Sequence, residues 1–206
     1  EELAGAALDA GAGFSTALLF AQVISLQGRR DEAEAALASL AAEADDDSSR
    51  GQVAVARFDN ASTWLGGDEL RILDEAEDAI LDPEWRDALE ARRLVVLLQE
   101  RGPRAAVEAA LPLLGRASGG ALAFACQIGG LGLARLGRLE AAIETAERGL
   151  AAATESPTLP ALYPWWHTVT RATALAYAGR LDDAEELVST HHRQALADGS
   201  VEAQAI

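Results

Sequence analysis

A short motif built around a glycine recurs along this chain of 206 residues, and it limits the possible folds more than any other feature. In its three clearest copies, at Gly28, Gly137 and Gly179, an apolar stretch ends in Gly-Arg, and an acidic residue and an alanine follow. Glycine can take the left-handed conformation that closes a helix, and an acidic residue is favourable in the first turn of the next helix. The motif therefore predicts a corner between two helices.

Two weaker copies of the corner lie at Gly67 and Gly102, so that the five glycines are spaced by 39, 35, 35 and 42 residues. Such a period is typical of stacked helix pairs, and its irregularity indicates a degenerate array. We predict an all-α fold of about five hairpins. Their approximate ranges are 11–45, 48–81, 83–117, 118–155 and 158–198, and residues 1–10 are interpreted as the remnant of a preceding unit.

Apolar periodicity and the breakers between hairpins give the expected helices. The first helices are expected at 13–27, 50–65, 84–101, 120–136 and 162–178, and the second helices at 31–43, 68–80, 104–116, 138–154 and 181–197. Pro112 falls inside one of the second helices, where we expect it to kink the helix or end it early, because proline cannot donate the helical hydrogen bond.

The composition agrees with helices and excludes two classes of partner. Half of the residues are hydrophobic, mostly alanine and leucine, whereas aromatic residues make up only 5%. With 33 acidic and 17 basic residues, the formal charge of −16 repels phosphate backbones and anionic lipids. We therefore expect no direct binding of nucleic acid or membranes by this segment.

The single cysteine, Cys126, lies in an apolar sequence that predicts a helix interior, so no internal disulfide is expected. The chain has no methionine, no basic and apolar leader, and no apolar run long enough to span a bilayer. We expect a cytoplasmic location, and we expect this sequence to be one repeat domain within a longer protein.

The corner sequence, Gly-x-hydrophobic-acid-x-Ala after an apolar helix, resembles the middle of the tetratricopeptide repeat signature. The resemblance covers nearly the whole chain and implies a right-handed α-solenoid. Ala33, Ala142 and Ala184, each five residues past a corner glycine, would be the small residues that let two helices approach closely. Ile72 and Val107 occupy that position in the second and third hairpins and depart from the pattern.

The alanine- and arginine-rich style of the corners, as in Leu-Gly-Arg-Leu-Glu-Ala-Ala at 136–142, also resembles the helical-repeat region of large LuxR-type (MalT-like) bacterial transcription regulators. In that family a nucleotide-binding switch precedes the repeats and a DNA-binding helix-turn-helix follows them. Neither end domain is visible here, and the chain has no lysine with which to build a phosphate-binding Gly-Lys loop. The resemblance implies a sensor or interaction module.

No catalytic or metal-binding set emerges from the sequence, and we expect neither enzyme activity nor a cofactor. The histidines are His167, His191 and His192, and the two adjacent ones would point in different directions on a helix, whereas a closed zinc site needs three or four convergent ligands. We expect them at the surface or at helix ends. The acidic run at 45–47 is interpreted as a solvated turn between hairpins. The glycines at 129–132 lie within an apolar helix, where close packing against a neighbouring helix is their expected use.

If the first helices line a concave face, as in tetratricopeptide arrays, fixed positions before each corner glycine face inward. They bring arginine, aromatic and amide side chains together in an otherwise acidic chain, and such groups suit a peptide or a small ligand with an anionic group. The candidate residues are Gln22, Arg57, Trp64, Arg92, Gln99, Phe124, Gln127, Arg135, Trp166, Thr173 and Tyr177. The alternative is that these residues only pack between repeats.

Three functions follow from this reading, and they belong to different classes. The first is a ligand- or protein-sensing module of a LuxR-type regulator, and the second is a constitutive adaptor that binds a protein partner without a small-molecule trigger. An all-α enzyme is a remote third. Self-association is also possible, since the end hairpins of an array cut from a longer protein expose apolar faces.

Overall fold

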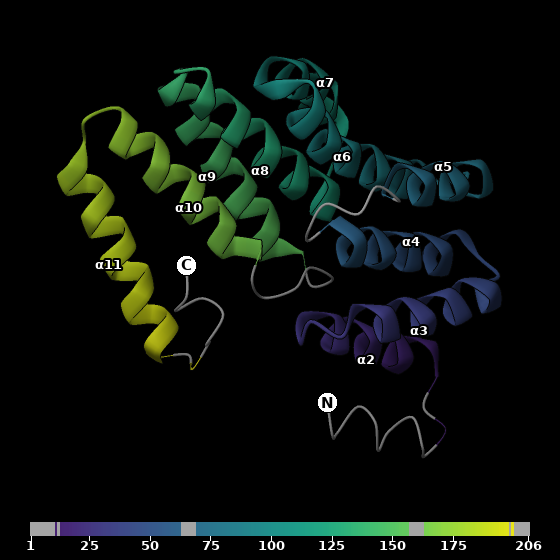
Figure 1. The fold of residues 1–206 in the computed structure, drawn as a ribbon. Helices are drawn as coiled ribbons and strands as arrows, with labels where there is room; N and C mark the ends of the chain where they lie inside the picture. Colours follow the sequence, from purple (N-terminus) through teal and green to yellow (C-terminus); the bar gives the residue numbers. More distant parts are fainter. Residues whose placement is uncertain (1–10, 12, 63–68, 157–162, 198, 200–206) are drawn as a thin grey trace. The chain divides into compact units, whose positions relative to one another are not determined.

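The computed structural model describes residues 11, 13–62, 69–156, 163–197 and 199 (Figure 1). The described residues form ten α-helices, packed in sequence order as consecutive hairpins, and the all-α prediction is confirmed. The first helices of the hairpins are α2 (Phe14–Leu26), α4 (Asp47–Ser62), α6 (Pro83–Glu100), α8 (Gly119–Arg135) and α10 (Tyr163–Tyr177). The second helices are α3 (Arg30–Glu43), α5 (Glu69–Ala79), α7 (Gly102–Arg116), α9 (Leu139–Glu155) and α11 (Leu181–Ala197).

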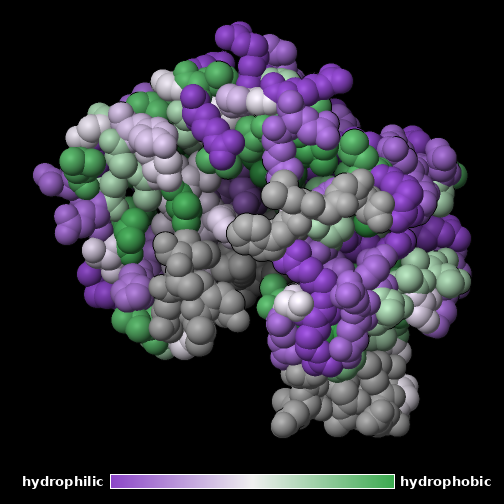
Figure 2. All heavy atoms as spheres, in the orientation of Figure 1, coloured by the Kyte–Doolittle hydropathy of each residue, from purple (hydrophilic) through white to green (hydrophobic). Residues whose placement is uncertain are grey.

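The chain divides into two compact units, and the division falls within α6. Unit 1 comprises Glu1–Leu89 and unit 2 comprises Glu90–Ile206. In unit 1, α3 contacts both α2 and α4, and α4 contacts α5. In unit 2, each helix from α7 to α11 contacts the next, and α8 also contacts α10. On the face shown in Figure 2, hydrophobic residues lie among hydrophilic ones in both units.

The corner glycines have the predicted left-handed backbone wherever the structure describes them. The φ angles of Gly28, Gly102, Gly137 and Gly179 lie between 73° and 83°. At three of these corners the amide of the arginine after the glycine donates to a carbonyl five residues earlier, as in Arg138 N to Leu133 O at 2.9 Å. Gly67 lies outside the described residues, so the second corner remains a prediction.

Pro112 does not end its helix early, so that alternative was wrong, and a kink at this residue stays a prediction. Helix α7 continues from Gly102 to Arg116 with Pro112 inside it. The residue is exposed, so the carbonyl that loses its partner at this proline can bond to water instead of remaining buried and unsatisfied. The apolar side of α7 nevertheless stays packed, because Val107, Ala110 and Leu113 are buried.

The core of each unit is built from small and branched side chains at the expected positions. In unit 1, Leu18 and Ala21 of α2 pack with residues of α3 and α4. In unit 2, Val107 packs with Ala142 and its neighbours on α8, α9 and α10. Ala33 and Ala142 are 0% exposed and Ala184 packs against the core of unit 2, while Ile72 and Val107 are also buried. Larger side chains are thus accommodated at this position in two hairpins.

The acidic run before α4 is more than a solvated turn. The side chain of Asp46 accepts a hydrogen bond from the amide of Ser49 at 2.7 Å and so caps α4. Asp47 Oδ2 accepts bonds from the amides of Leu81 and Asp82, both at 2.8 Å. One carboxylate therefore ties the start of α4 to the segment that leads into α6.

Candidate functional site

The predicted ligand-facing residues of unit 2 fall on one side of α8 and α10. Phe124, Gln127 and Arg135 follow helical spacing on α8, and Trp166, Thr173 and Tyr177 follow it on α10. The two helices lie close together, since a Cβ atom added to Gly130 would stand 3.3 Å from Thr170 Cγ2. We call these six residues, together with Arg92 of α6, the first-helix face.

Arg92 does not project into solvent as an open cationic group. Its side chain is 3% exposed, and its guanidinium carbon lies 4.6 Å from the centre of the Phe124 ring, in a cation–π contact. Phe124 is itself buried. The structure thus brings these two predicted residues together, but as a packed pair within unit 2.

The outer part of the first-helix face is accessible. Trp166 is 41% exposed and Tyr177 is 66% exposed, and Thr173 between them is half-buried. Arg135 is exposed near the end of α8. The Oε1 atom of Gln127 is buried and accepts no hydrogen bond from the described residues. Two exposed aromatic side chains on one stripe of α10 have the chemistry of a binding surface.

The remaining predicted site residues belong to unit 1, to the end of α6 or to the part of the chain that is not described. In unit 1, Arg57 donates from Nε and Nη2 to Glu34 Oε1, at 2.8 and 2.6 Å, and Gln22 is half-buried on α2. Gln99 is exposed near the end of α6. Trp64 lies outside the described residues.

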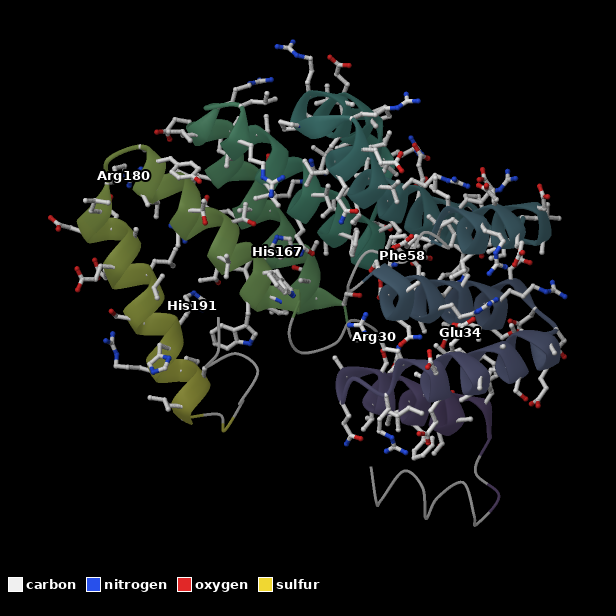
Figure 3. The ribbon with its side chains drawn as sticks, viewed as in Figure 1. Arg30, Glu34, Phe58, His167, Arg180 and His191 are labelled. Atoms are coloured by element: carbon white, nitrogen blue, oxygen red, sulfur yellow. The ribbon has the colours of Figure 1, made fainter. Side chains whose placement is uncertain are left out.

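His167 is buried, and its expected surface position was wrong. Its ring is 1% exposed, and it occupies the space beside Gly149 of α9 and Cys126 of α8 (Figure 3). A Cβ atom on Gly149 would stand within 3.0 Å of His167 Cε1, His167 Nδ1 and Cys126 Cβ. Neither ring nitrogen has a hydrogen-bond partner among the described residues.

Burial sets the protonation of this pair. It lowers the pKa of His167 from 6.5 to about 4, and it raises the pKa of the Cys126 thiol to about 11. Both groups are therefore neutral at pH 7, and the thiol is not an activated nucleophile. The sequence could not predict this, because the glycine that makes room for the imidazole lies on a different helix.

A half-buried polar cluster joins α10 to α11. The ring of His191 stands edge-on to Trp165, with 5.2 Å between centroids, and lies within 3.5 Å of the Thr168 hydroxyl (Figure 3). Burial, and then the charge of Arg171, lowers the pKa of His191. Arg171 also pairs with Glu147 of α9 at 3.1 Å. These contacts hold α10 between its two neighbours.

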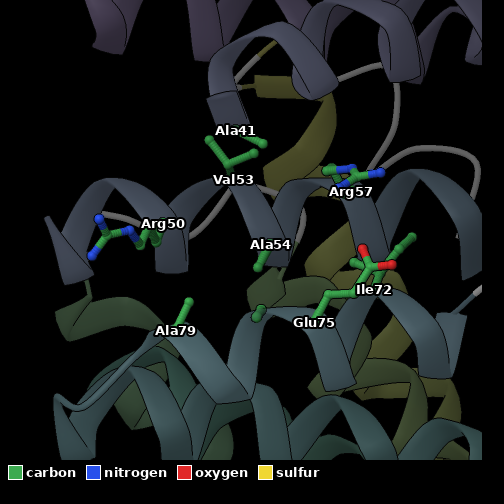
Figure 4. A pocket seen from close by; sticks show the side chains of 9 residues that line it. Ala41, Arg50, Val53, Ala54, Arg57, Ile72, Glu75 and Ala79 are labelled. Carbon is green, nitrogen blue, oxygen red and sulfur yellow. The ribbon is translucent and has the colours of Figure 1, made fainter. Parts of the chain in front are cut away.

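Unit 1 contains a partly open cavity of about 240 Å³ between α4 and α5, to whose wall Ala41 of α3 also contributes (Figure 4). Its lining combines aliphatic side chains with three charged ones. The lining residues are Ala41, Arg50, Val53, Ala54, Arg57, Ile72, Glu75, Ala76 and Ala79. Of these, only Arg57 belongs to the residues predicted from the sequence.

The described residues contain no group of three or more histidine, cysteine, aspartate or glutamate side chains that could hold a metal ion. None of their helices is long and apolar enough to cross a membrane.

Comparison of the chain with family models, with curated proteins and with solved structures gives no match. The function must therefore be argued from the geometry of this chain.

Proposed function

We propose that this chain is a non-catalytic binding module, and that the first-helix face of unit 2 holds a segment of a protein or peptide. The observation that carries the proposal is the exposure of Trp166 and Tyr177, at 41% and 66%, on one stripe of α10. Large aromatic side chains contribute much of the binding energy in protein interfaces, because they cover a wide area and have few rotamers to lose.

The neighbouring groups suit the polar atoms of a peptide. Gln127 Oε1 is buried and has no partner among the described residues, so a side-chain movement that exposed it would let it accept a hydrogen bond from a peptide N–H. Thr173 and the exposed Arg135 add a hydroxyl and a cation. A small anionic effector is the alternative occupant, and Arg135 would meet its charge, since Arg92 packs against Phe124.

A solenoid architecture and a regulatory context are part of the same proposal. The repeated corner sequences support a right-handed, tetratricopeptide-like solenoid and a role as the sensor or interaction module of a LuxR-type regulator. A constitutive adaptor is the second form of the proposal. Hairpins that contact mainly their neighbours can change curvature at low cost, which suits a sensor.

The proposal is tested by selecting random peptides on the purified chain and measuring their affinity by fluorescence polarisation. Trp166→Ala or Tyr177→Ala should weaken the selected peptides about tenfold or more. The matched control is Leu181→Ala on α11, because Leu181 is 65% exposed but lies on another helix. The proposal would be contradicted if the selected peptides bound both aromatic variants with the same affinity as the original chain.

A small-molecule sensor and a constitutive adaptor differ in their response to effectors. A ligand that binds the native chain alone must raise its melting temperature. If small carboxylates or phosphates raise it, and Arg135→Gln removes the increase, the effector form is favoured. If none raises it while a selected peptide does, the adaptor form is favoured.

A further inference from the structure

We propose that the cavity between α4 and α5 of unit 1 binds a small aliphatic monocarboxylate. This site is separate from the first-helix face, and it does not depend on the function proposed for that face. The size of the cavity, the apolar character of most of its wall and the position of its charged side chains all favour such a ligand.

The size and the wall set the apolar part of the ligand. A volume of about 240 Å³ lies below the range of roughly 300–1,000 Å³ that is common for drug-sized ligands. Six of the nine lining residues are aliphatic, and Val53, Ala54 and Ile72 among them are buried. A short alkyl chain placed against these side chains would lose contact with water, which is favourable.

The two arginines set the charge of the ligand. Arg50 and Arg57 lie seven residues apart on α4, and therefore on the same side of the helix, and both line the cavity. The partner of Arg50 is the carboxylate of Asp47, at a long distance of 3.7 Å with both side chains partly exposed. Pairs of this kind contribute little, so the Arg50 guanidinium can turn toward a bound anion.

The remaining contacts favour a single negative charge over a double one. Arg57 already donates two hydrogen bonds to Glu34, and Glu75 pairs with Arg71 at 2.8 Å. A dianion such as phosphate would be repelled more strongly than a monoanion by Glu75 in the lining and by Glu34 on Arg57, in a chain of formal charge −16. One carboxylate facing Arg50, with its alkyl chain inward, fits both the charge and the wall.

The experiment uses hexanoate as the probe, with hexanol and hexylamine as controls for the alkyl chain and for the charge. Binding is followed by calorimetry and by NMR shifts of alanine methyl groups. We expect saturable binding of hexanoate, weakened about tenfold or more by Arg50→Gln, because a charge-assisted hydrogen bond is lost. Ala79→Phe, at the exposed end of α5, should fill the cavity and abolish binding in a chain that remains folded.

The matched control is Arg180→Gln in unit 2, which removes an equal charge from an exposed pair of the same sequence spacing, Arg180 with Asp183. This variant should bind hexanoate like the original chain. Equal binding of hexanol and hexanoate, equal losses in both arginine variants, or no saturable binding would each overturn the proposal. None of these outcomes bears on the peptide test of the first-helix face, so the two proposals can fail separately.

Discussion

In each unit, a ring from another helix fills the space where the Cβ atom of a helix glycine would otherwise lie, and the two rings differ in their chemistry. In unit 1 the indole of Trp85 lies against Gly51 of α4, and in unit 2 the imidazole of His167 lies against Gly149 of α9. Trp85 is half-buried and its ring cannot be charged, whereas His167 is buried and titratable. The ring that packs against the glycine can therefore take up a proton in unit 2 but not in unit 1.

The largest expected effect comes from adding one methyl group at each glycine. An alanine normally stabilises a helix interior relative to glycine, but here the new Cβ would stand within 3.0 Å of the ring. We expect Gly149→Ala to destabilise unit 2 by about 3–4 kcal/mol and Gly51→Ala to destabilise unit 1 by about 2 kcal/mol, because overpacking forces side chains and backbone to move. Hydrogen exchange in α9 and in α4 would measure the two units separately.

A second substitution distinguishes the two glycines. All three atoms nearest to the added Cβ at Gly51 belong to Trp85, whereas at Gly149 one of them is Cys126 Cβ. Trp85→Ala should therefore relieve the clash of Gly51→Ala fully, and the double variant should be no less stable than Trp85→Ala alone. His167→Ala should relieve Gly149→Ala only in part. Equal relief in both pairs would contradict this account of the two contacts.

Acid should weaken unit 2 through His167. The folded pKa of about 4 lies below the ordinary value of 6.5, so the unfolded chain takes up this proton first. The stability contributed by burying the neutral ring is complete above about pH 6.5 and is lost as the pH falls toward 4. The free energy of unfolding lost in this way is about 3 kcal/mol, since each unit of the difference between the two pKa values corresponds to roughly 1.4 kcal/mol.

The measurement is the free energy of opening of α9 and α10, followed by hydrogen exchange between pH 7 and pH 4.5. His167→Phe keeps a ring beside Gly149 but cannot take up a proton, so its stability should fall less over this range. His191→Phe removes the other histidine packed against α10, whose pKa is also lowered, and so shows how much of the acid response comes from that ring. A slope that His167→Phe leaves unchanged would assign the acid response to other groups.

In unit 1, the contact of Trp85 with Gly51 lies close to the hydrogen bonds that join Asp47 to the segment before α6. Asp47 lies one turn before Gly51, and its carboxylate accepts the amides of Leu81 and Asp82. We expect Asp47→Ala to cost about 1–2 kcal/mol, since two amides lose their acceptor, and Asp47→Asn to cost less, since the amide oxygen can still accept. Hydrogen exchange at the amides of Leu81 and Asp82 measures the effect. If these amides were equally protected in Asp47→Ala and Asp47→Asn, their hydrogen bonds to residue 47 could not explain a difference in stability between the two variants.

The sequence predicted the local parts of this fold well. The ten helices start and end within three residues of their predicted limits, because glycine corners and apolar periodicity are properties of neighbouring residues. The close packing expected of the glycines at 129–132 is also confirmed, since Gly129 and Gly132 face Ala110 and Val107 of α7, and Gly130 faces Thr170 of α10.

The sequence predicted the site less well, because the direction of a long side chain depends on distant neighbours. Arg92 was predicted to face a ligand, but its guanidinium packs against the ring of Phe124, which comes from the next hairpin. No local pattern indicates that Gly149 leaves room for His167, or that Gly51 leaves room for Trp85. The cavity of unit 1 was missed for the same reason, since its wall is drawn from three helices.

The smallest expected changes in stability come from substituting glycines that have no ring packed against them. These substitutions test whether the packed ring causes the large destabilisation expected at Gly149 and Gly51. Gly137, with φ of 73°, and Gly115, within α7, have open space where a Cβ would stand. Gly137→Ala should cost only about 1 kcal/mol, from backbone strain, and Gly115→Ala should stabilise the chain by about 0.5 kcal/mol, from helix propensity. Urea unfolding would measure both. If Gly115→Ala were as harmful as Gly149→Ala, the covering ring could not be the reason that Gly149 must be glycine.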